Sequence, residues 1–359
     1  MFTKNTRDVR YFTVCTEKYD ECNDRCVERS MTTHEKPLSS VLETVGETPL
    51  VKVQESPADL PVYAKLESFN PGASVKDRIG EYIIDGLLSS GDLDEGGKIV
   101  EPTAGNTGIG MALAATQYDV EAVFVVPEKF SVEKQTLMRS LGAEVVNTPT
   151  DDGMEGAIER AHEIVAAEAN AVVPQQFSSR LNVDAHRETT GPEIYDALDG
   201  EVGAIVAGCG TAGTLMGIAE FLLDREPATH VVAVEPEGSL FSRAHGHDVE
   251  ESEYHTEGIG THDLSTNELF DPDIVDEIRR VSDRAAHAEV KRLAREEGQL
   301  VASSAGAASV AAIDVAERAL SGELSLPYNT VVTVFPDSSE RYLSKGIYDS
   351  YEEWTHGRP

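Results

Sequence analysis

The chain alternates short apolar runs with segments of helical periodicity. Strongly apolar runs are typical of strands in parallel sheets, which are covered on both faces. Helical patterns of 10 to 15 residues between such runs predict right-handed βαβ units, and therefore an α/β fold. The predicted strands are 98–101, 122–126, 143–146, 204–207, 231–234 and 331–335, and the clearest helical patterns are 108–116 and 154–168.

A chain of 359 residues exceeds one ordinary core and suits two domains folded on each other. No apolar run approaches the roughly 18 residues of a membrane span, and the N-terminus has no apolar signal core. We therefore expect a cytoplasmic protein.

Charge adds a second constraint, because 64 acidic residues face 30 basic ones, for a formal net charge of -34. Salt screens such self-repulsion, since the Debye length falls to about 3 Å at 1 M. The charge indicates a halophilic source, with an acidic protein of a mesophile as the alternative. Nucleic acid and anionic membranes are poor partners for this surface.

The first 31 residues differ from the rest, because they hold six basic and six acidic side chains. Cys15, Cys22 and Cys26 also lie there, in a spacing that matches no standard zinc pattern. Either this is an appendage whose thiols bind metal or sense redox state, or translation begins at Met31.

In parallel sheets, ligands bind beyond the carboxyl ends of the strands, and two polar loops follow predicted strands there. Residues 101–108 place hydroxyls, an amide and glycines before a helix, where backbone N–H groups can hold a carboxylate. The alternative is an ordinary turn with Thr107 as N-cap. Residues 208–214 bring glycines to the next such helix and suit a phosphate. This loop also fits G-x-G-x-x-G, with Glu235 closing the following strand, so a dinucleotide site is a rival.

Two further segments carry candidate chemistry. Lys76 follows the turn Pro71-Gly72 and begins a helical pattern. It is either a solvated lysine of a first turn or a buried amine whose lowered pKa lets it condense with an aldehyde. Ser338 follows the last apolar strand, where a hydroxyl can meet a ring nitrogen without protonating it.

Taken in chain order, the segments at Lys76, 101–108, 208–214 and Ser338 resemble those of the fold-type II pyridoxal 5′-phosphate enzymes. The resemblance is specifically to the cysteine synthase and cystathionine β-synthase family, in a haloarchaeal form. The resemblance extends from Gly46 to about Lys345 and includes residues 175–177, 189–193 and 257–260. It implies two doubly wound, mostly parallel-sheet domains, as in the tryptophan synthase β-like fold, with the cofactor in the cleft between them. It also implies a homodimer. The implied parts are an N-terminal extension of residues 1–35, a larger phosphate-binding domain of residues 36–70 and 180–359, and a smaller mobile substrate-binding domain of residues 71–179.

By this resemblance, Lys76 carries the cofactor as a Schiff base and later removes the α-proton of the substrate. Asn106 contacts the 3′-oxygen of the cofactor, and Ser338 meets its pyridine nitrogen. No metal ligands are predicted. The remaining implied contacts are Gly210, Thr211, Ala212, Gly213 and Thr214 to the phosphate, and Thr103, Ala104, Thr107, Gln176 and Gly258 to the substrate.

The implied reaction is β-replacement on an O-activated serine, in first place O-acetylserine, by sulfide to give cysteine or by homocysteine to give cystathionine. Ala104 stands where cysteine synthases typically have Ser, and it resembles the bacterial cystathionine β-synthases, which slightly favours homocysteine. Ala212 replaces a Gly, so the phosphate loop needs a backbone angle compatible with a Cβ. Serine or O-phosphoserine as donor, a non-catalytic cofactor-binding paralogue and a nicotinamide-dependent oxidoreductase remain alternatives.

Overall fold

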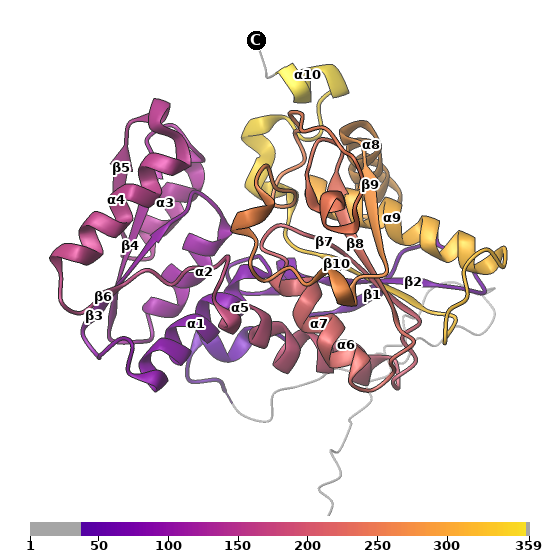
Figure 1. The fold of residues 1–359 in the computed structure, drawn as a ribbon, viewed down its shortest axis with the longest axis horizontal. Coiled ribbons are helices and arrows are strands. Elements are labelled where there is room, and N and C mark those ends of the chain that lie inside the picture. Colours follow the sequence, from indigo (N-terminus) through magenta and orange to yellow (C-terminus); the bar gives the residue numbers. More distant parts are fainter. Residues whose placement is uncertain (1–36, 357–359) are drawn as a thin grey trace, which may run out of the picture.

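The computed structural model describes residues 37–356, which form two mostly parallel sheets with their covering helices (Figure 1). The three N-terminal cysteines and Met31 lie outside the described residues.

The larger sheet has six strands in the order β1-β2-β10-β7-β8-β9. Only the pairing of β1 with β2 is antiparallel, and the other four pairings within this sheet are parallel. Its strands are β1 (Leu50–Lys52), β2 (Val62–Leu66), β7 (Ala204–Gly208), β8 (His230–Pro236), β9 (Glu277–Val281) and β10 (Val331–Phe335).

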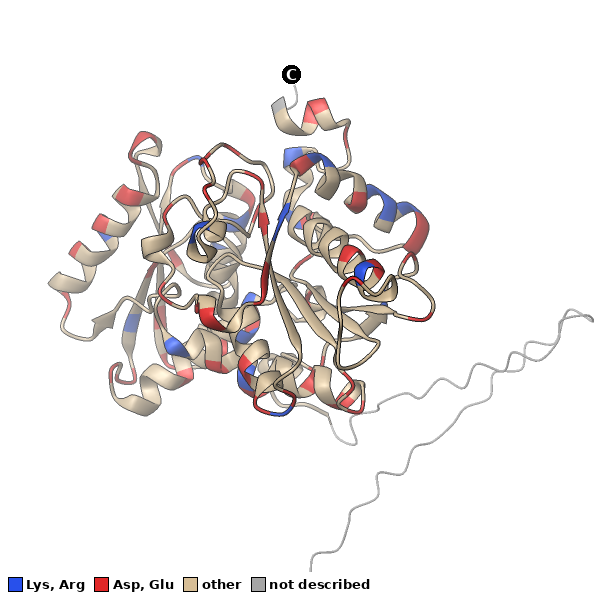
Figure 2. Ribbon diagram, turned by 45° about the vertical axis from the view of Figure 1, so that its right-hand side comes forward, with Lys and Arg blue, Asp and Glu red and all other residues tan. Residues whose placement is uncertain are grey.

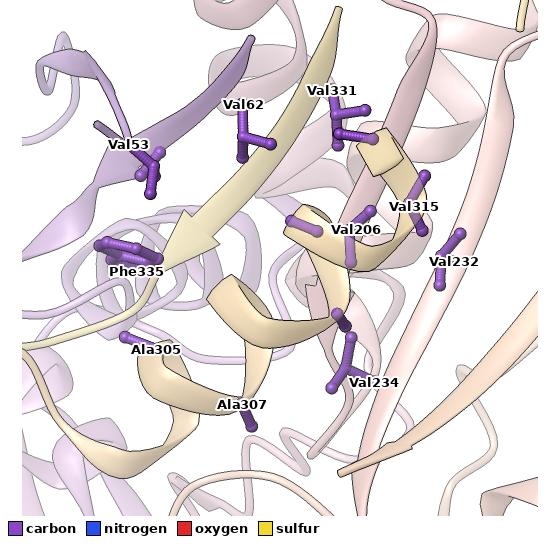
Figure 3. Packing of buried hydrophobic residues seen from close by; sticks show 14 of the residues in the cluster. Val53, Val62, Val206, Val232, Val234, Ala305, Ala307, Val315, Val331 and Phe335 are labelled. Atoms are coloured by element: carbon purple, nitrogen blue, oxygen red, sulfur yellow. The ribbon is translucent and has the colours of Figure 1, made fainter. Parts of the chain in front are cut away.

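Each central strand of this sheet is buried on both faces. In β7, Val206 points to the cluster formed with α9 (Ser303–Leu320), whereas Ile205 points to the cluster formed with α7 (Gly213–Leu223). Figure 3 shows the first of these clusters, in which Val206 and Val232 lie beside Val315 of α9. Burial on both faces explains why these strands were visible in the sequence as continuous apolar runs.

The smaller sheet has the order β5-β4-β3-β6 and is parallel throughout. Helices α1 and α2 contribute to the core on one of its faces, and α4 covers the other. The strands are β3 (Gly97–Pro102), β4 (Val120–Pro127), β5 (Glu144–Thr148) and β6 (Ala171–Val172), and the helices of this half are α1 (Lys76–Ser90), α2 (Asn106–Ala115), α3 (Val132–Ser140) and α4 (Gly153–Ala167).

The remaining helices connect the sheets or cover the larger one. Helices α5, α6 and α7 follow the smaller sheet, and α5 continues into α6 through one π-helical turn. These elements are α5 (Arg180–Ala185), the π turn η4 (His186–Thr190), α6 (Gly191–Ala197), α8 (Asp283–Arg292), the 3-10 segment η9 (Ser339–Lys345) and α10 (Tyr351–His356).

The predicted elements agree with the structure in type and order, with three differences in detail. Helix α2 begins at Asn106 with Gly105 as its N-cap, so the alternative with Thr107 as N-cap is wrong. Strand β4 runs through Pro127 instead of ending before it. Asp77 and Arg78 are buried, so the alternative of a solvated first turn at Lys76 is also wrong.

Helices α1 and α2 approach each other at two glycines. A Cβ on Gly110 would lie 2.3 Å from the carbonyl oxygen of Lys76, and a Cβ on Gly80 would lie 2.5 Å from the carbonyl oxygen of Gly110. Neither position has room for a side chain. The first turn of the helix that begins with Lys76 therefore lies directly against the helix that begins with Asn106.

A buried ionic network fixes the other side of this first turn. The Arg78 side chain, 1% exposed, donates to the Glu67 carboxylate at 2.7 and 2.9 Å and to the Glu193 carboxylate at 2.7 and 2.8 Å. The Lys65 ammonium lies 2.7 Å from Glu193 as well. Lys65 and Glu67 lie at the end of β2, and Glu193 lies in α6. The network therefore joins the start of α1 to the larger sheet.

We expect Arg78→Met to lower the free energy of unfolding by about 3 to 5 kcal/mol, because it leaves buried carboxylates without their partner. The matched control is Arg160→Met, since Arg160 forms an ion pair with Glu163 in which the side chains are 49% and 56% exposed. That change should cost no more than about 1 kcal/mol. Denaturant unfolding in molar salt measures both, and equal losses would contradict the role of the network.

Candidate active site at the boundary of the two sheets

The segment before Lys76 is attached to the end of β10. The Val75 N–H donates to the Pro336 carbonyl at 2.8 Å, and Ser74 forms an isolated antiparallel bridge with Asp337. Helix α1 then begins at Lys76, and its N-cap residue Val75 makes no side-chain capping hydrogen bond. Two loops far apart in the sequence therefore meet at Lys76, at the carboxyl end of a central strand.

The Lys76 amine lies in an environment that disfavours its charge. Burial lowers the pKa of Lys76 to about 8, and the nearby Asp337 carboxylate partly opposes this shift. An amine with this pKa is neutral much more often near neutral pH than an ordinary lysine. Lys76 can therefore attack a carbonyl group, as the prediction requires.

Asp337 is the carboxylate beside Lys76, and the sequence analysis did not single it out. Its Oδ2 accepts from Asn106 Nδ2 at 2.7 Å and from the Tyr342 hydroxyl at 2.6 Å. Burial raises the pKa of Asp337 above its usual range. The Lys134 ammonium of α3 lies 4.3 Å from the centre of the Tyr342 ring. A second buried lysine therefore lies next to the tyrosine that donates to Asp337.

Two buried oxygens in this cluster have no hydrogen-bond partner among the described residues: Asn106 Oδ1 and Asp337 Oδ1. Buried polar atoms are usually satisfied, so unpartnered ones next to a reactive amine indicate a polar ligand. Both atoms are acceptors, so together with the depressed pKa of Lys76 they fit an aldehyde cofactor whose ring carries a hydrogen-bond donor such as a hydroxyl group.

Two of the predicted substrate-carboxylate residues, Thr107 and Gln176, lie in one hydrogen-bonded chain. Thr107 Oγ1 donates to Gln176 Oε1 at 2.6 Å, and Gln176 Nε2 donates to Glu101 Oε1 at 3.0 Å. The amide of Gln176 retains a second N–H. Thr103 Oγ1 accepts the Gly105 N–H at 3.2 Å. The structure brings Thr107 and Gln176 together and adds Glu101 behind Gln176. Thr103 lies close to the residue after Thr107, since a Cβ on Gly108 would lie 3.1 Å from Thr103 Cγ2. Ala104 lies in the same turn, half-buried.

The predicted phosphate loop connects β7 to the N-terminus of α7. Ala212, the N-cap of α7, has φ +67°, so a residue with a Cβ occupies the left-handed region there. That conformation costs about 1 kcal/mol or more relative to Gly. A Cβ on Gly213 would lie 2.1 Å from Asn182 Oδ1, and one on Gly210 would lie 2.6 Å from the Gly258 carbonyl oxygen. The loop is compact, and it retains the helix N-terminus that favours an anion.

Asn182 joins the substrate loop to the phosphate loop. Its Nδ2 donates to the Gln176 carbonyl at 2.8 Å and to Thr211 Oγ1 at 3.0 Å, and the residue is fully buried. This residue was not among the predicted site residues, because nothing in its local sequence distinguishes it from a helix-interior asparagine.

Glu235, the acidic residue on which the dinucleotide alternative depended, has a structural role. It is fully buried, and its carboxylate accepts the N–H groups of Phe241 and Ser242 at 2.7 and 3.1 Å. These contacts hold the loop after β8. Since the carboxylate is already engaged inside the protein, the geometry does not suit a ribose contact.

Comparison with known proteins identifies the class to which this site belongs. Residues 41–337 match the family model described as pyridoxal-phosphate dependent enzyme. The chain belongs to this family, and its cofactor is pyridoxal 5′-phosphate. The predicted family, fold class and cofactor are thereby confirmed.

Within the family, the chain is similar to enzymes that make sulfur amino acids. It is 44% identical to the O-acetylserine dependent cystathionine beta-synthase of Bacillus subtilis, over 87% of this chain and 98% of the relative. It is 40% identical to the cysteine synthase of Helicobacter pylori, over 87% and 99% of the two chains. The crystal structure of the O-acetylserine dependent cystathionine beta-synthase from Helicobacter pylori superimposes with a TM-score of 0.77, at 41% identity over 87% and 99% of the two chains.

Residues 37–356 contain neither a metal-binding cluster nor a membrane-spanning helix. No group of three or more His, Cys, Asp or Glu side chains in this part of the chain is arranged to hold a metal ion. None of its helices combines the length and the apolar character needed to cross a membrane.

Glu101 gives the site a measurable pH dependence. Burial raises the pKa of Glu101 to about 7 from an ordinary value of 4.5. The folded state then holds this proton more tightly than the unfolded state, so the free energy of unfolding falls as pH rises from about 4.5 to 7. The fall is about 1.4 kcal/mol for each unit of pKa difference.

We expect Glu101→Gln to remove this contribution, so that the variant gains stability relative to the parent as pH rises through the same range. Denaturant unfolding at a series of pH values measures the difference. The control is Glu144→Gln, which changes an exposed carboxylate on β5 of the same sheet. A Glu101→Gln variant whose stability followed pH in parallel with the parent would contradict the assignment.

Proposed function

We propose that this protein catalyses β-replacement on O-acetyl-L-serine, in which a sulfur nucleophile takes the place of acetate. With sulfide the product is cysteine, and with homocysteine it is cystathionine. The observation that carries the proposal is the desolvated Lys76 amine near Asp337, whose carboxylate accepts a hydrogen bond from Asn106. The loop before α7 offers a helix N-terminus suited to a phosphate, and Thr107 with Gln176 suits a carboxylate. Relatives that are 40% or more identical over nearly their whole length bear the names of these two activities.

Lys76 is the residue to which we assign proton transfer. Pyridoxal phosphate supplies an electron-withdrawing ring that stabilises negative charge at the α-carbon of an attached amino acid. With the cofactor bound, Lys76 Nζ would accept the α-proton of the substrate. Its lowered pKa keeps a fraction of the amine neutral for this purpose.

The substrate carboxylate is assigned to Thr103, Thr107 and Gln176. Thr107 donates to Gln176 in the structure described above. When a carboxylate binds, the Thr107 hydroxyl and the second N–H of Gln176 can both turn to it, since a carboxylate accepts several hydrogen bonds. Ala104 and Gly258 remain proposed substrate contacts, and neither offers a side-chain donor. Ala104 directly follows Thr103.

The ring nitrogen has two candidate partners. Ser338 remains the predicted one, and it is half-buried at the start of η9, next to Val301 across an isolated bridge. Ser304 is a second candidate, because it is 2% exposed in the first turn of α9 and its Oγ lies 4.0 Å from the position of a Cβ on Gly258. The Gly258 carbonyl in turn lies against Gly210 of the phosphate loop.

The wider setting of the enzyme is also part of the proposal. Acidic side chains are distributed over both halves of the molecule (Figure 2), and the net charge of -34 suits a halophilic protein that works in the cytoplasm at high salt. We further propose a homodimer in which residues 71–179 form a substrate-binding domain that moves relative to residues 36–70 and 180–359.

The test is a steady-state assay of the holoenzyme in molar salt with O-acetylserine and either sulfide or homocysteine, with products identified by mass spectrometry. We expect acetate release to depend on both substrates and to yield cysteine or cystathionine. Lys76→Ala should lose at least a thousandfold in rate, because it removes the amine to which we assign the α-proton. Failure with both acceptors would contradict the proposal.

The choice of acceptor follows from the same assay. The ratio of kcat/KM for homocysteine to that for sulfide measures it directly, and the Ala104 loop favours homocysteine. A holoenzyme whose cofactor absorption band does not change on adding O-acetylserine, and which forms no product with either acceptor, is a non-catalytic paralogue.

A further inference from the structure

A buried histidine lies behind the proposed phosphate loop and contacts it through one hydroxyl. His186 begins the π turn between α5 and α6 and is fully buried. Its Nδ1 lies 2.9 Å from Thr190 Oγ1, and its Nε2 lies 3.1 Å from Thr214 Oγ1. Thr214 is the second residue of α7 and the last residue of the phosphate loop.

The packing fixes this histidine against α7. A Cβ on Gly217 would lie 2.3 Å from the Val183 carbonyl oxygen and 2.7 Å from His186 Cβ, so α7 can approach α5 and η4 only because residue 217 is a glycine. The imidazole is therefore held where both ring nitrogens face a hydroxyl. Burial, with smaller effects from the Arg78 and Lys76 charges, holds the pKa of His186 well below its usual value, so the ring is neutral.

A neutral imidazole has one N–H and one acceptor nitrogen, so two arrangements of protons are available. In the first, Nδ1 accepts from the Thr190 hydroxyl and Nε2–H donates to Thr214 Oγ1, which leaves the Thr214 proton free. In the second, both directions are reversed and the Thr214 proton is bound to Nε2. Phosphate oxygens accept hydrogen bonds, so only the first arrangement lets Thr214 donate to a phosphate.

We propose that His186 is a positioning residue that directs the Thr214 hydroxyl proton toward the cofactor phosphate. The chain of donors runs from Thr190 to His186, from His186 to Thr214, and from Thr214 to the phosphate. This inference rests on the proposed placement of the phosphate at residues 210–214. The effect of His186 should be confined to the phosphate, because within residues 37–356 the Thr214 hydroxyl is the group of the phosphate loop to which the imidazole is hydrogen-bonded.

The experiment compares the affinity of the apoenzyme for pyridoxal 5′-phosphate with its affinity for pyridoxal, which lacks the phosphate. His186→Leu should weaken binding of the phosphorylated cofactor by about tenfold to a hundredfold and leave pyridoxal binding within about twofold, as expected for loss of one hydrogen bond to a charged group. His186→Gln, whose amide places an N–H close to the position of Nε2, should recover most of the loss. Circular dichroism confirms that each variant is folded.

Thr214→Val tests the path of the effect. It should weaken pyridoxal 5′-phosphate binding as much as His186→Leu does, and the double variant should be no weaker than Thr214→Val alone. The matched control is Thr333→Val, which changes a fully buried threonine of β10 whose Oγ1 has no hydrogen-bond partner among the described residues. That variant should bind both ligands as the parent does.

The outcomes distinguish the positioning role of His186 from the placement of the phosphate at residues 210–214. If Thr214→Val is selective for the phosphorylated ligand but His186→Leu weakens both ligands equally, or if their effects add in the double variant, the positioning role of His186 is wrong and the phosphate site stands. If Thr214→Val itself weakens both ligands equally or neither, the placement of the phosphate is wrong and the inference fails with it.

Discussion

Arg78 bonds to carboxylates from two distant parts of the chain, and the geometry of the active site depends on this contact. Glu67 follows β2 and Glu193 belongs to α6, so the guanidinium sets the first turn of α1 against the larger sheet. The pairing satisfies charges that would otherwise be costly to bury. Lys76 is only two residues earlier. The buried ion pairs of Arg78 therefore fix the position of the Lys76 amine at the carboxyl ends of the strands.

The same region also joins the two halves of the molecule. Asn106 of α2 bonds to Asp337, which follows β10, and Ser344 of η9 donates to Glu133 of α3 at 2.8 Å. Lys134 extends from α3 to the Tyr342 ring. The reactive amine thus lies where polar contacts between the two sheets are concentrated. Any movement of the smaller sheet relative to the larger one would change the surroundings of Lys76.

Much of this arrangement could be predicted from the sequence, because strands buried on both faces are apolar throughout and the chemistry lies in the loops that follow them. Lys76, Asn106 and residues 210–214 were predicted in this way, and their roles toward the cofactor stay predictions. His186 and Asn182 were not, because each lies inside a helical segment and acquires its role from partners distant in the chain, such as Thr214 and Thr211. Asp337 was passed over for its neighbour Ser338, since only the backbone bridge to Ser74 decides which side chain faces Asn106.

The most direct measurement of the role of Lys76 is borohydride reduction of the holoenzyme, followed by peptide mapping to locate the phosphopyridoxyl group. A second buried lysine, Lys134, lies in the same polar cluster, so the outcome is a real choice between two amines. We predict the modification on Lys76 with Lys134 unmodified. Modification of Lys134 in its place, or a reduced enzyme with Lys76 unmodified, would contradict the assignment.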